Sequence, residues 1–261
     1  MYETISLTTD ARGVATLALD RAEKHNAMSA AMLGELRDAA RALAHDDKVR
    51  VVVLTGHGKS FCAGADLGWM REQMAADAAT RAAQARGLAE MLALLDGLPK
   101  PLIGRIQGNA FGGGVGMASV CDVAIGADHL KMGLTEVRLG IIPATIGPYV
   151  VARMGPARAR RVFFSGRLFD AAEAVELGLL ARAVPEAELD DAVEAEVLPY
   201  LSAAPGAVAA AKKLVADLAP PIDDHVIDHT IAALVDCWEG EEAPEGIGAF
   251  FDKRPAKWLA Q

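Results

Sequence analysis

Two glycine-rich segments are the parts of this sequence whose residue types could do chemistry. FCAGAD at 61–66 follows the apolar run 51–54, and GNAFGGG at 108–114 follows the apolar run 102–106. Glycines there let backbone N–H groups approach a ligand without interference from side chains. If Gly113 begins a helix, its unpaired N–H and the helix dipole favour a developing negative charge. Two such donors on one oxygen would form an oxyanion hole, where each donor lowers the barrier by about 3–4 kcal/mol.

Other motifs that could carry chemistry are excluded by their spacing. The GKS at 58–60 lacks the P-loop glycine five residues earlier, where Val53 stands. The second glycine-rich segment never completes G-x-G-x-x-G, because Met117 occupies the last position, and no G-x-S-x-G is present. His225 and His229 stand four apart among aspartates, a spacing that metal ligands use. We interpret them as part of a solvated acidic helix face and expect no metal.

Composition narrows the class of protein. The 261 residues carry 26 Lys+Arg against 35 Asp+Glu, so the net charge is 26 − 35 = −9, and 52% of the residues are hydrophobic. This balance predicts a compact core and no bulk attraction to nucleic acid or to an anionic membrane. Cys62, Cys121 and Cys237 form no C-x-x-C pair, which indicates a reducing compartment. No basic start precedes an apolar stretch, so we expect a cytoplasmic protein without a signal peptide.

The elements that must position the glycine-rich segments alternate between strand and helix over the first two thirds of the chain. The pattern predicts strands at 2–8, 14–19, 51–54, 102–106 and 121–125, a helix at about 29–44 with Ser29 as its N-cap, and one long helix from 75 that ends before Pro99. Right-handed crossovers and a largely parallel sheet follow from this alternation. After about residue 145 the pattern is mainly helical.

Several ordered motifs give the chain a resemblance to a known family. They are FCAGADL at 61–67, GNAFGGG at 108–114 with Cys121 and Asp122 after it, GLTEVRLGIIP at 133–143, Gly166-Arg167, Ala174, Gly178-Leu179, and FDKR at 251–254. Together they resemble the enoyl-CoA hydratase/isomerase (crotonase) family over nearly the whole chain. The resemblance implies an α/β spiral of ββα units at 1–195, a helical C-terminal trimerisation region at 196–261, and homotrimers that commonly pair into hexamers.

The resemblance also assigns roles to residues. The amides of Ala63 and Gly113 match the oxyanion hole for an acyl-CoA thioester carbonyl. Residues matching the region that holds the adenine and pantetheine of coenzyme A are Lys24, Ala27, Ala65, Asp66 and Leu67. Lys253, from a neighbouring subunit, matches a contact to a coenzyme A phosphate. No cofactor is implied beyond coenzyme A as part of the substrate.

One departure from the family pattern concerns the acid and base. Hydratases of the family use two glutamates; here the first position is Gly116 and the second is Glu136. With Glu136 alone, three interpretations remain open. The carboxylate could move a proton between Cα and Cγ, isomerising a 3-enoyl-CoA to a 2-enoyl-CoA. It could activate water and deliver the Cα proton itself, with a second group or the substrate's own carboxylate orienting the water. The chain could also have lost hydratase chemistry and cleave or bind another acyl-CoA.

The loop after Glu136 favours hydration. PATIGPY at 143–149 resembles the bacterial methylglutaconyl-CoA and isohexenylglutaconyl-CoA hydratase branch, whose members often also lack the first glutamate. Ala144 lies where the family's dienoyl-CoA isomerases carry an aspartate, which argues against that branch. We therefore expect a hydratase of a branched or carboxylated enoyl-CoA, with Trp69, Met70 and Met74 as candidates for the acyl pocket. A non-catalytic acyl-CoA- or RNA-binding paralogue is the alternative from another class.

Overall fold

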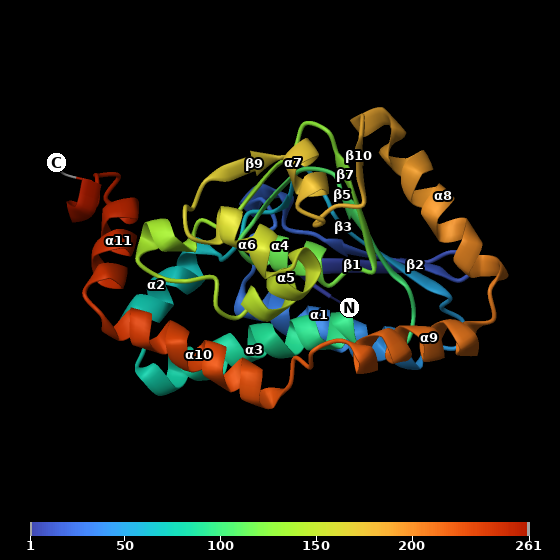
Figure 1. The fold of residues 1–261 in the computed structure, drawn as a ribbon, viewed down its shortest axis with the longest axis horizontal. Coiled ribbons are helices and arrows are strands. Elements are labelled where there is room, and N and C mark those ends of the chain that lie inside the picture. The colour runs from blue at the N-terminus through green and yellow to red at the C-terminus, as the bar shows by residue number, and fades with distance from the viewer. Residues whose placement is uncertain (1, 260–261) are drawn as a thin grey trace.

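The computed structural model describes residues 2–259, which form two β-sheets and the helices around them (Figure 1). The strands are β1 (Ile5–Thr9), β2 (Val14–Leu19), β3 (Val51–Gly56), β4 (Ser60–Cys62), β5 (Leu102–Ile106), β6 (Asn109–Phe111), β7 (Val123–Ala127), β8 (Lys131–Gly133), β9 (Leu168–Asp170) and β10 (Arg182–Val184). The α-helices are α1 (Ala30–His45), α2 (Leu67–Ala75), α3 (Ala78–Asp96), α4 (Gly113–Ser119), α5 (Gly147–Met154), α6 (Pro156–Phe163), α7 (Ala171–Glu176), α8 (Leu189–Ser202), α9 (Pro205–Leu218), α10 (Asp224–Glu239) and α11 (Glu242–Phe251). The 3-10 helices are η1 (Ala22–Lys24), η2 (Glu136–Leu139), η3 (Glu186–Glu188) and η4 (Lys257–Leu259).

The larger sheet has the strand order β1-β2-β3-β5-β7-β10. β1 and β2 pair as an antiparallel hairpin, and every other neighbouring pair in this sheet is parallel. All six residues of β3 are buried, as expected for an apolar strand covered on both faces. Leu189, Val193 and Val197 of α8 pack on one face of this sheet, and helices including α1 and α3 cover the other. The expected parallel α/β sheet is confirmed.

The smaller sheet has the order β4-β6-β8-β9. The chain leaves the large sheet at β3, β5 and β7 and enters the small one at β4, β6 and β8, with helices between successive turns. This is the expected spiral of ββα units. Because β4 and β6 pair in parallel, the two glycine-rich segments lie side by side.

Most expected elements form, with two corrections. The hairpin is present, and Ser29 caps α1 by accepting a hydrogen bond from the N–H of Met32 at 3.3 Å. The long helix expected from residue 75 forms as α3 and ends before Pro99, but it begins at Ala78 after the Asp77 N-cap, and α2, which ends at Ala75, is a separate helix that was not expected. The strand expected at 121–125 starts two residues later, because the turn that follows α4 occupies residues 120–122.

The C-terminal part is helical, as expected. α10 packs against α3 and α11, and α11 packs against η2, so this part of the chain lies next to the turns of the spiral (Figure 1). The expected division between residues 195 and 196 falls within α8, and remains a prediction. Within residues 2–259, none of the helices has the length and apolarity needed to cross a membrane.

Candidate active site

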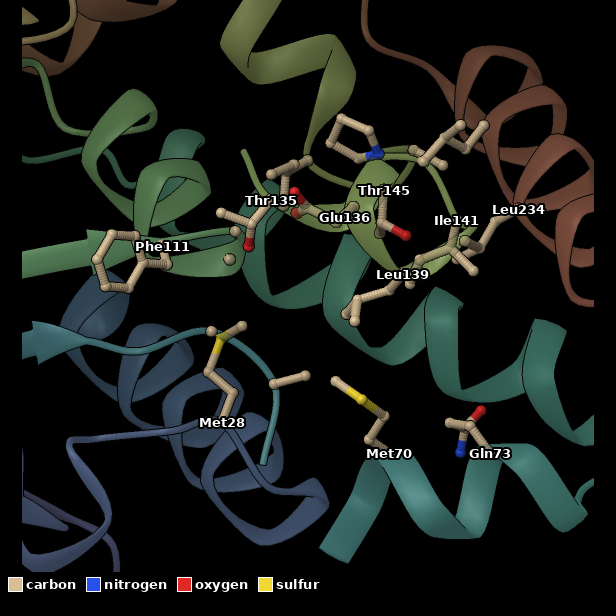
Figure 2. Close-up of a pocket in the computed structure, with 18 of the residues that line it drawn as sticks. Met28, Met70, Gln73, Phe111, Thr135, Glu136, Leu139, Ile141, Thr145 and Leu234 are labelled. Atoms are coloured by element: carbon tan, nitrogen blue, oxygen red, sulfur yellow. The ribbon is translucent and has the colours of Figure 1, made fainter. Parts of the chain in front are cut away.

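One cavity of about 520 Å³ opens beside the paired glycine-rich segments. Its wall combines both segments with η2, the loop at 140–146, and helices α2, α3 and α10, and most of the side chains are apolar (Figure 2). Three exposed side chains, Leu67, Leu168 and Phe250, surround the mouth. Gln73 of α2 and Ala85 of α3, each at most 5% exposed, line the part of the cavity that we call the deep end.

Glu136 is the carboxylic acid on the wall of this cavity. It begins η2, and its Oε2 is buried with no hydrogen-bond partner among residues 2–259. Burial raises the pKa of the Glu136 carboxyl to about 7, with a small opposing effect from its own backbone N–H. A carboxyl that titrates near neutrality can accept and return a proton at physiological pH.

The backbone amides of Ala65 and Gly113 on the cavity wall are free to bind a ligand. Ala65 pairs with Met28 as a parallel bridge in which Met28 donates to the carbonyl of Gly64 and Asp66 donates to that of Met28, at 2.8 and 2.9 Å. This pattern leaves the Ala65 N–H without an acceptor in the described chain. The Gly113 N–H, at the start of α4, is likewise without an acceptor there.

The amide of Ala63 differs from the expectation. Ala63 lines the cavity, but its N–H donates to the carbonyl of His25 at 3.0 Å. An amide already engaged in a backbone bond is a poor donor to a ligand oxygen. The Ala63 amide is therefore not available to a ligand, whereas the amides of Ala65 and Gly113 are.

Gly112 sets the distance between the second glycine-rich segment and Glu136. Its φ of 50° lies in the left-handed region, and a Cβ there would lie 2.9 Å from Oε1 of Glu136. The absence of a side chain at Gly112 therefore allows the Glu136 carboxyl to approach the start of α4.

The position of the family's first glutamate is filled by apolar side chains. A Cβ on Gly116 would lie 2.6 Å from Cγ2 of Ile146 and 3.7 Å from Cδ1 of Leu92. Beside Ile146, Thr145 is 4% exposed and lines the cavity, and its hydroxyl makes no hydrogen bond within the part of the chain that the structure describes. The loop that fills the glutamate's place thus brings a hydroxyl to the same cavity (Figure 2).

Of the other residues expected to hold coenzyme A, only Leu67 lies on the cavity wall. Leu67 lines the cavity and is 51% exposed. Asp66 caps α2 through the N–H groups of Gly68 and Trp69 and forms an ion pair with Arg21 at 2.9 Å, so its side chain positions α2. Lys24, Ala27 and Lys253 do not line the cavity of their own chain. Lys24 and Lys253 are exposed, and Ala27 is buried.

Several wall residues were not expected from the sequence. Of the three candidates for the acyl pocket, Trp69 and Met70 line the cavity and Met74 does not. Gln73, Arg81 and Trp238 line it as well, from three different helices. The sequence contains no motif that joins these helices, so only the packing of α2, α3 and α10 reveals them.

A spiral of ββα units that places the buried Glu136 carboxyl and the free amides of Ala65 and Gly113 in one cavity defines an α/β enzyme of the crotonase fold. A family model described as enoyl-CoA hydratase/isomerase matches residues 9–261. The chain belongs to this family.

Individual relatives agree with this assignment. The chain is 31% identical to the crotonyl-CoA hydratase of Syntrophomonas wolfei, over 100% of this chain and 99% of that protein. Among solved structures, an enoyl-CoA hydratase from Shewanella pealeana is 37% identical, with a TM-score of 0.81, covering 99% of this chain and 97% of that one. AtuE of Pseudomonas aeruginosa is 36% identical, also with a TM-score of 0.81, covering 99% and 100%.

Proposed function

We propose that this chain is an enoyl-CoA hydratase that adds water across the 2,3 double bond of an acyl-CoA thioester. The observation that carries this proposal is the buried, unpartnered carboxyl of Glu136 in the same cavity as the free amides of Ala65 and Gly113. Relatives that are named crotonyl-CoA hydratase and enoyl-CoA hydratase support it. Coenzyme A enters as part of the substrate, and no other cofactor takes part.

The proposed reaction needs one carboxylate and the two amides. The thioester oxygen accepts hydrogen bonds from Ala65 and Gly113, which stabilise the enolate by about 3–4 kcal/mol each. Glu136 takes a proton from water while the water oxygen bonds to C3, and the electrons of the double bond move to the thioester oxygen. Collapse of the enolate then takes the proton from Glu136 to C2, which regenerates the carboxylate.

Water needs a second group to orient it, because Gly116 supplies no carboxylate. We assign this role to the Thr145 hydroxyl, which lies next to the side chain that fills the Gly116 site and has no other partner in residues 2–259. A hydroxyl can orient a water molecule either by accepting a hydrogen bond from it or by donating one to its oxygen, but a hydroxyl carries no charge. Glu136 therefore remains the acid and the base.

Thr145→Val is expected to lower kcat for hydration by about tenfold to a hundredfold with little change in KM, because the variant keeps the shape and loses one hydrogen bond to water. Thr145→Ser keeps the hydroxyl and is the matched control, with most of the activity retained. Steady-state kinetics with crotonyl-CoA measures both. Normal kcat in Thr145→Val, with a loss in Thr135→Val, would transfer the role to the other threonine on the wall.

The pH dependence follows from Glu136. Because the carboxylate form takes the proton from water, kcat/KM for hydration is expected to rise with pH, with its midpoint near the pKa of about 7 to which burial raises Glu136. Above that pH the profile is expected to be flat until another group titrates. A midpoint near 4.5, or a fall in rate between pH 6 and 8, would contradict the role of Glu136 as the base.

The substrate is proposed to be a branched enoyl-CoA. The resemblance of residues 143–149 to the hydratase branch for branched substrates supports this, and so does the volume of about 520 Å³ of a mostly apolar cavity walled in part by three helices. A carboxylated chain would require a free cation near the deep end. Arg81 lies there, but it is paired with Glu239, so we favour a branched chain without a carboxylate.

Binding of coenzyme A and assembly are proposed on the family resemblance. Lys24, Ala27 and Leu67 would contact coenzyme A near the mouth, with Lys253 from a neighbouring subunit on a phosphate. Apolar side chains on α9, among them Leu214 and Leu218, are exposed in the single chain, which supports a homotrimer or a pair of trimers. Light scattering on the purified protein distinguishes these states.

Three unpaired cysteines support a cytoplasmic location.

An isomerase is the second candidate function, because Glu136 alone can move a proton from C2 to C4 on an enolate held by the same amides. Incubation with crotonyl-CoA, 3-methylglutaconyl-CoA and a 3-enoyl-CoA in deuterated water distinguishes the candidates by mass and NMR. A 3-hydroxyacyl product supports the hydratase. Migration of the double bond without addition of water supports the isomerase, and acyl-CoA or RNA binding without turnover supports the non-catalytic alternative.

A further inference from the structure

The deep end of the cavity contains a polar side chain that the proposed reaction does not use. Gln73 on α2 is 4% exposed and lines the cavity among apolar neighbours. Figure 2 shows it with Met70 on the wall opposite Glu136, on the side where Ile141 and Leu234 lie. A buried amide in an apolar chamber requires partners for both its donor and its acceptor.

The orientation of the Gln73 amide is fixed by a chain of two hydrogen bonds. Trp69 donates its indole N–H to Oε1 of Gln84, and an indole nitrogen can only donate. This fixes which end of the Gln84 amide faces the tryptophan. Gln73 reaches the same Oε1 and must therefore present its amino group to it. The carbonyl oxygen of Gln73 is consequently turned away from Gln84.

That carbonyl oxygen is an unused acceptor. Within the described residues Oε1 of Gln73 accepts no hydrogen bond. It is also not one of the fully buried side-chain atoms that lack a partner, so it is accessible to solvent. It remains accessible although the residue is almost completely buried, and the cavity is the space that Gln73 lines. A donor arriving in the cavity can reach it.

The charges around Gln73 favour a neutral donor. Arg81 donates its Nε–H to the backbone carbonyl of Gln73 at 2.9 Å, pairs its guanidinium with Glu239, and lies over the Trp238 ring at 5.3 Å. Its positive charge is therefore offset by Glu239. A carboxylate in this place would meet the lone pairs of the Gln73 carbonyl without a free cation, whereas a hydroxyl would donate its hydrogen to that carbonyl.

We propose that this deep end is a subsite for a hydroxyl group carried by the acyl chain, bound by the side-chain carbonyl of Gln73 and oriented through Gln84 and Trp69. The inference rests on the proposed function, because it places the acyl chain of a CoA thioester in this cavity. It extends that function by giving the enzyme a preference for a hydroxylated over a plain alkyl chain of equal length.

The test measures binding rather than turnover, so it does not depend on the reaction. Isothermal titration compares saturated acyl-CoA thioesters that end in a methyl, a hydroxyl or a carboxylate, each with four, six and eight carbons. The wild type is expected to bind the hydroxyl-ended chain of the best length about tenfold more tightly than its methyl-ended counterpart, as for one net hydrogen bond. In Gln73→Met, which has a similar length and no acceptor, this ratio is expected to fall to about one.

Two further variants test the origin of the preference. Glu72→Met changes the adjacent, exposed residue of α2, which does not line the cavity, and the ratio is expected to stay at the wild-type value. Trp69→Phe removes the donor that fixes Gln84, so the Gln73 amide can rotate and the ratio is expected to decrease. A wild-type ratio in Trp69→Phe would overturn the proposed orientation.

The outcomes separate this inference from the function on which it rests. Equal affinity of the wild type for methyl-ended and hydroxyl-ended chains at all three lengths would overturn the subsite while leaving the proposed hydratase intact. Tighter binding of the carboxylate-ended chain would also overturn it and would assign the deep end to Arg81. Failure to bind any of the thioesters would remove the proposed function itself, and the subsite with it.

Discussion

Glu136→Gln is expected to lower kcat for hydration by about 10³-fold to 10⁴-fold while acyl-CoA affinity changes little. The amide has nearly the same shape as the carboxyl but cannot take a proton from water, and a positioned acid or base typically contributes about 10²-fold to 10⁴-fold. The free amides of Ala65 and Gly113 remain, so binding of the thioester oxygen is retained. Steady-state kinetics and titration with a saturated acyl-CoA measure the two effects separately.

The same variant is expected to be more stable than the wild type at alkaline pH. Burial raises the pKa of Glu136 from 4.5 to about 7, so the folded protein holds this proton more tightly than the unfolded chain does. Stability from this group is therefore present below pH 4.5 and is lost as the pH rises through 7. At pH 8, the glutamine variant should gain up to about 3 kcal/mol in the free energy of unfolding, and at pH 4 the difference should vanish.

Glu72→Gln is the matched control for both effects, because it removes one carboxylate from the exposed face of α2. It should leave kcat and the pH dependence of unfolding as in the wild type. Near-normal turnover in Glu136→Gln would remove Glu136 from the mechanism. An unfolding free energy equal to that of the wild type at pH 8 would show that the folded protein does not resist ionisation of this carboxyl.

Long, regularly patterned elements could be predicted from the sequence, and short ones could not. The period of apolar residues gave α1 and its Ser29 cap, and the continuous apolar run gave β3. The four strands of the small sheet have three residues each, too few for any periodicity to be visible. Only the family resemblance predicted the ββα spiral to which they belong.

The candidate site shows the same limit at the level of single amides. The sequence places Ala63 and Ala65 two residues apart, where an extended strand would turn both N–H groups the same way. Gly64 lies between them with a φ of 92°, so the chain turns, and the Ala63 N–H faces His25 while that of Ala65 stays free. Which amide faces the cavity depends on this one backbone angle, and residue spacing does not reveal it.

Gly116→Glu, which installs the family's first glutamate, is expected to destabilise the protein by about 4 kcal/mol or more and not to increase hydration. Its Cβ would lie 2.6 Å from Cγ2 of Ile146, a branched side chain that cannot move aside easily, and its carboxylate would be placed among apolar groups. Thermal and denaturant unfolding measure the loss, with Gly116→Ala as the control that adds the Cβ without the charge. Wild-type stability and faster hydration in Gly116→Glu would contradict this packing argument.

Shortening the Ile146 side chain should restore part of the stability that Gly116→Glu loses. This result distinguishes a steric clash with Ile146 from a position that tolerates no side chain at all. Ile146→Ala deletes the methyl group that a Cβ at 116 would strike and leaves a small space beside Thr145. In the double variant, the two substitutions should couple favourably by about 1–3 kcal/mol in unfolding free energy. Hydration should also be faster in the double variant than in Ile146→Ala alone, because two carboxylates then share the water. Additive losses in unfolding free energy, together with an unchanged rate of hydration, would contradict two points. They are that Ile146 excludes a carboxylate from position 116, and that Thr145 alone compensates for the missing carboxylate.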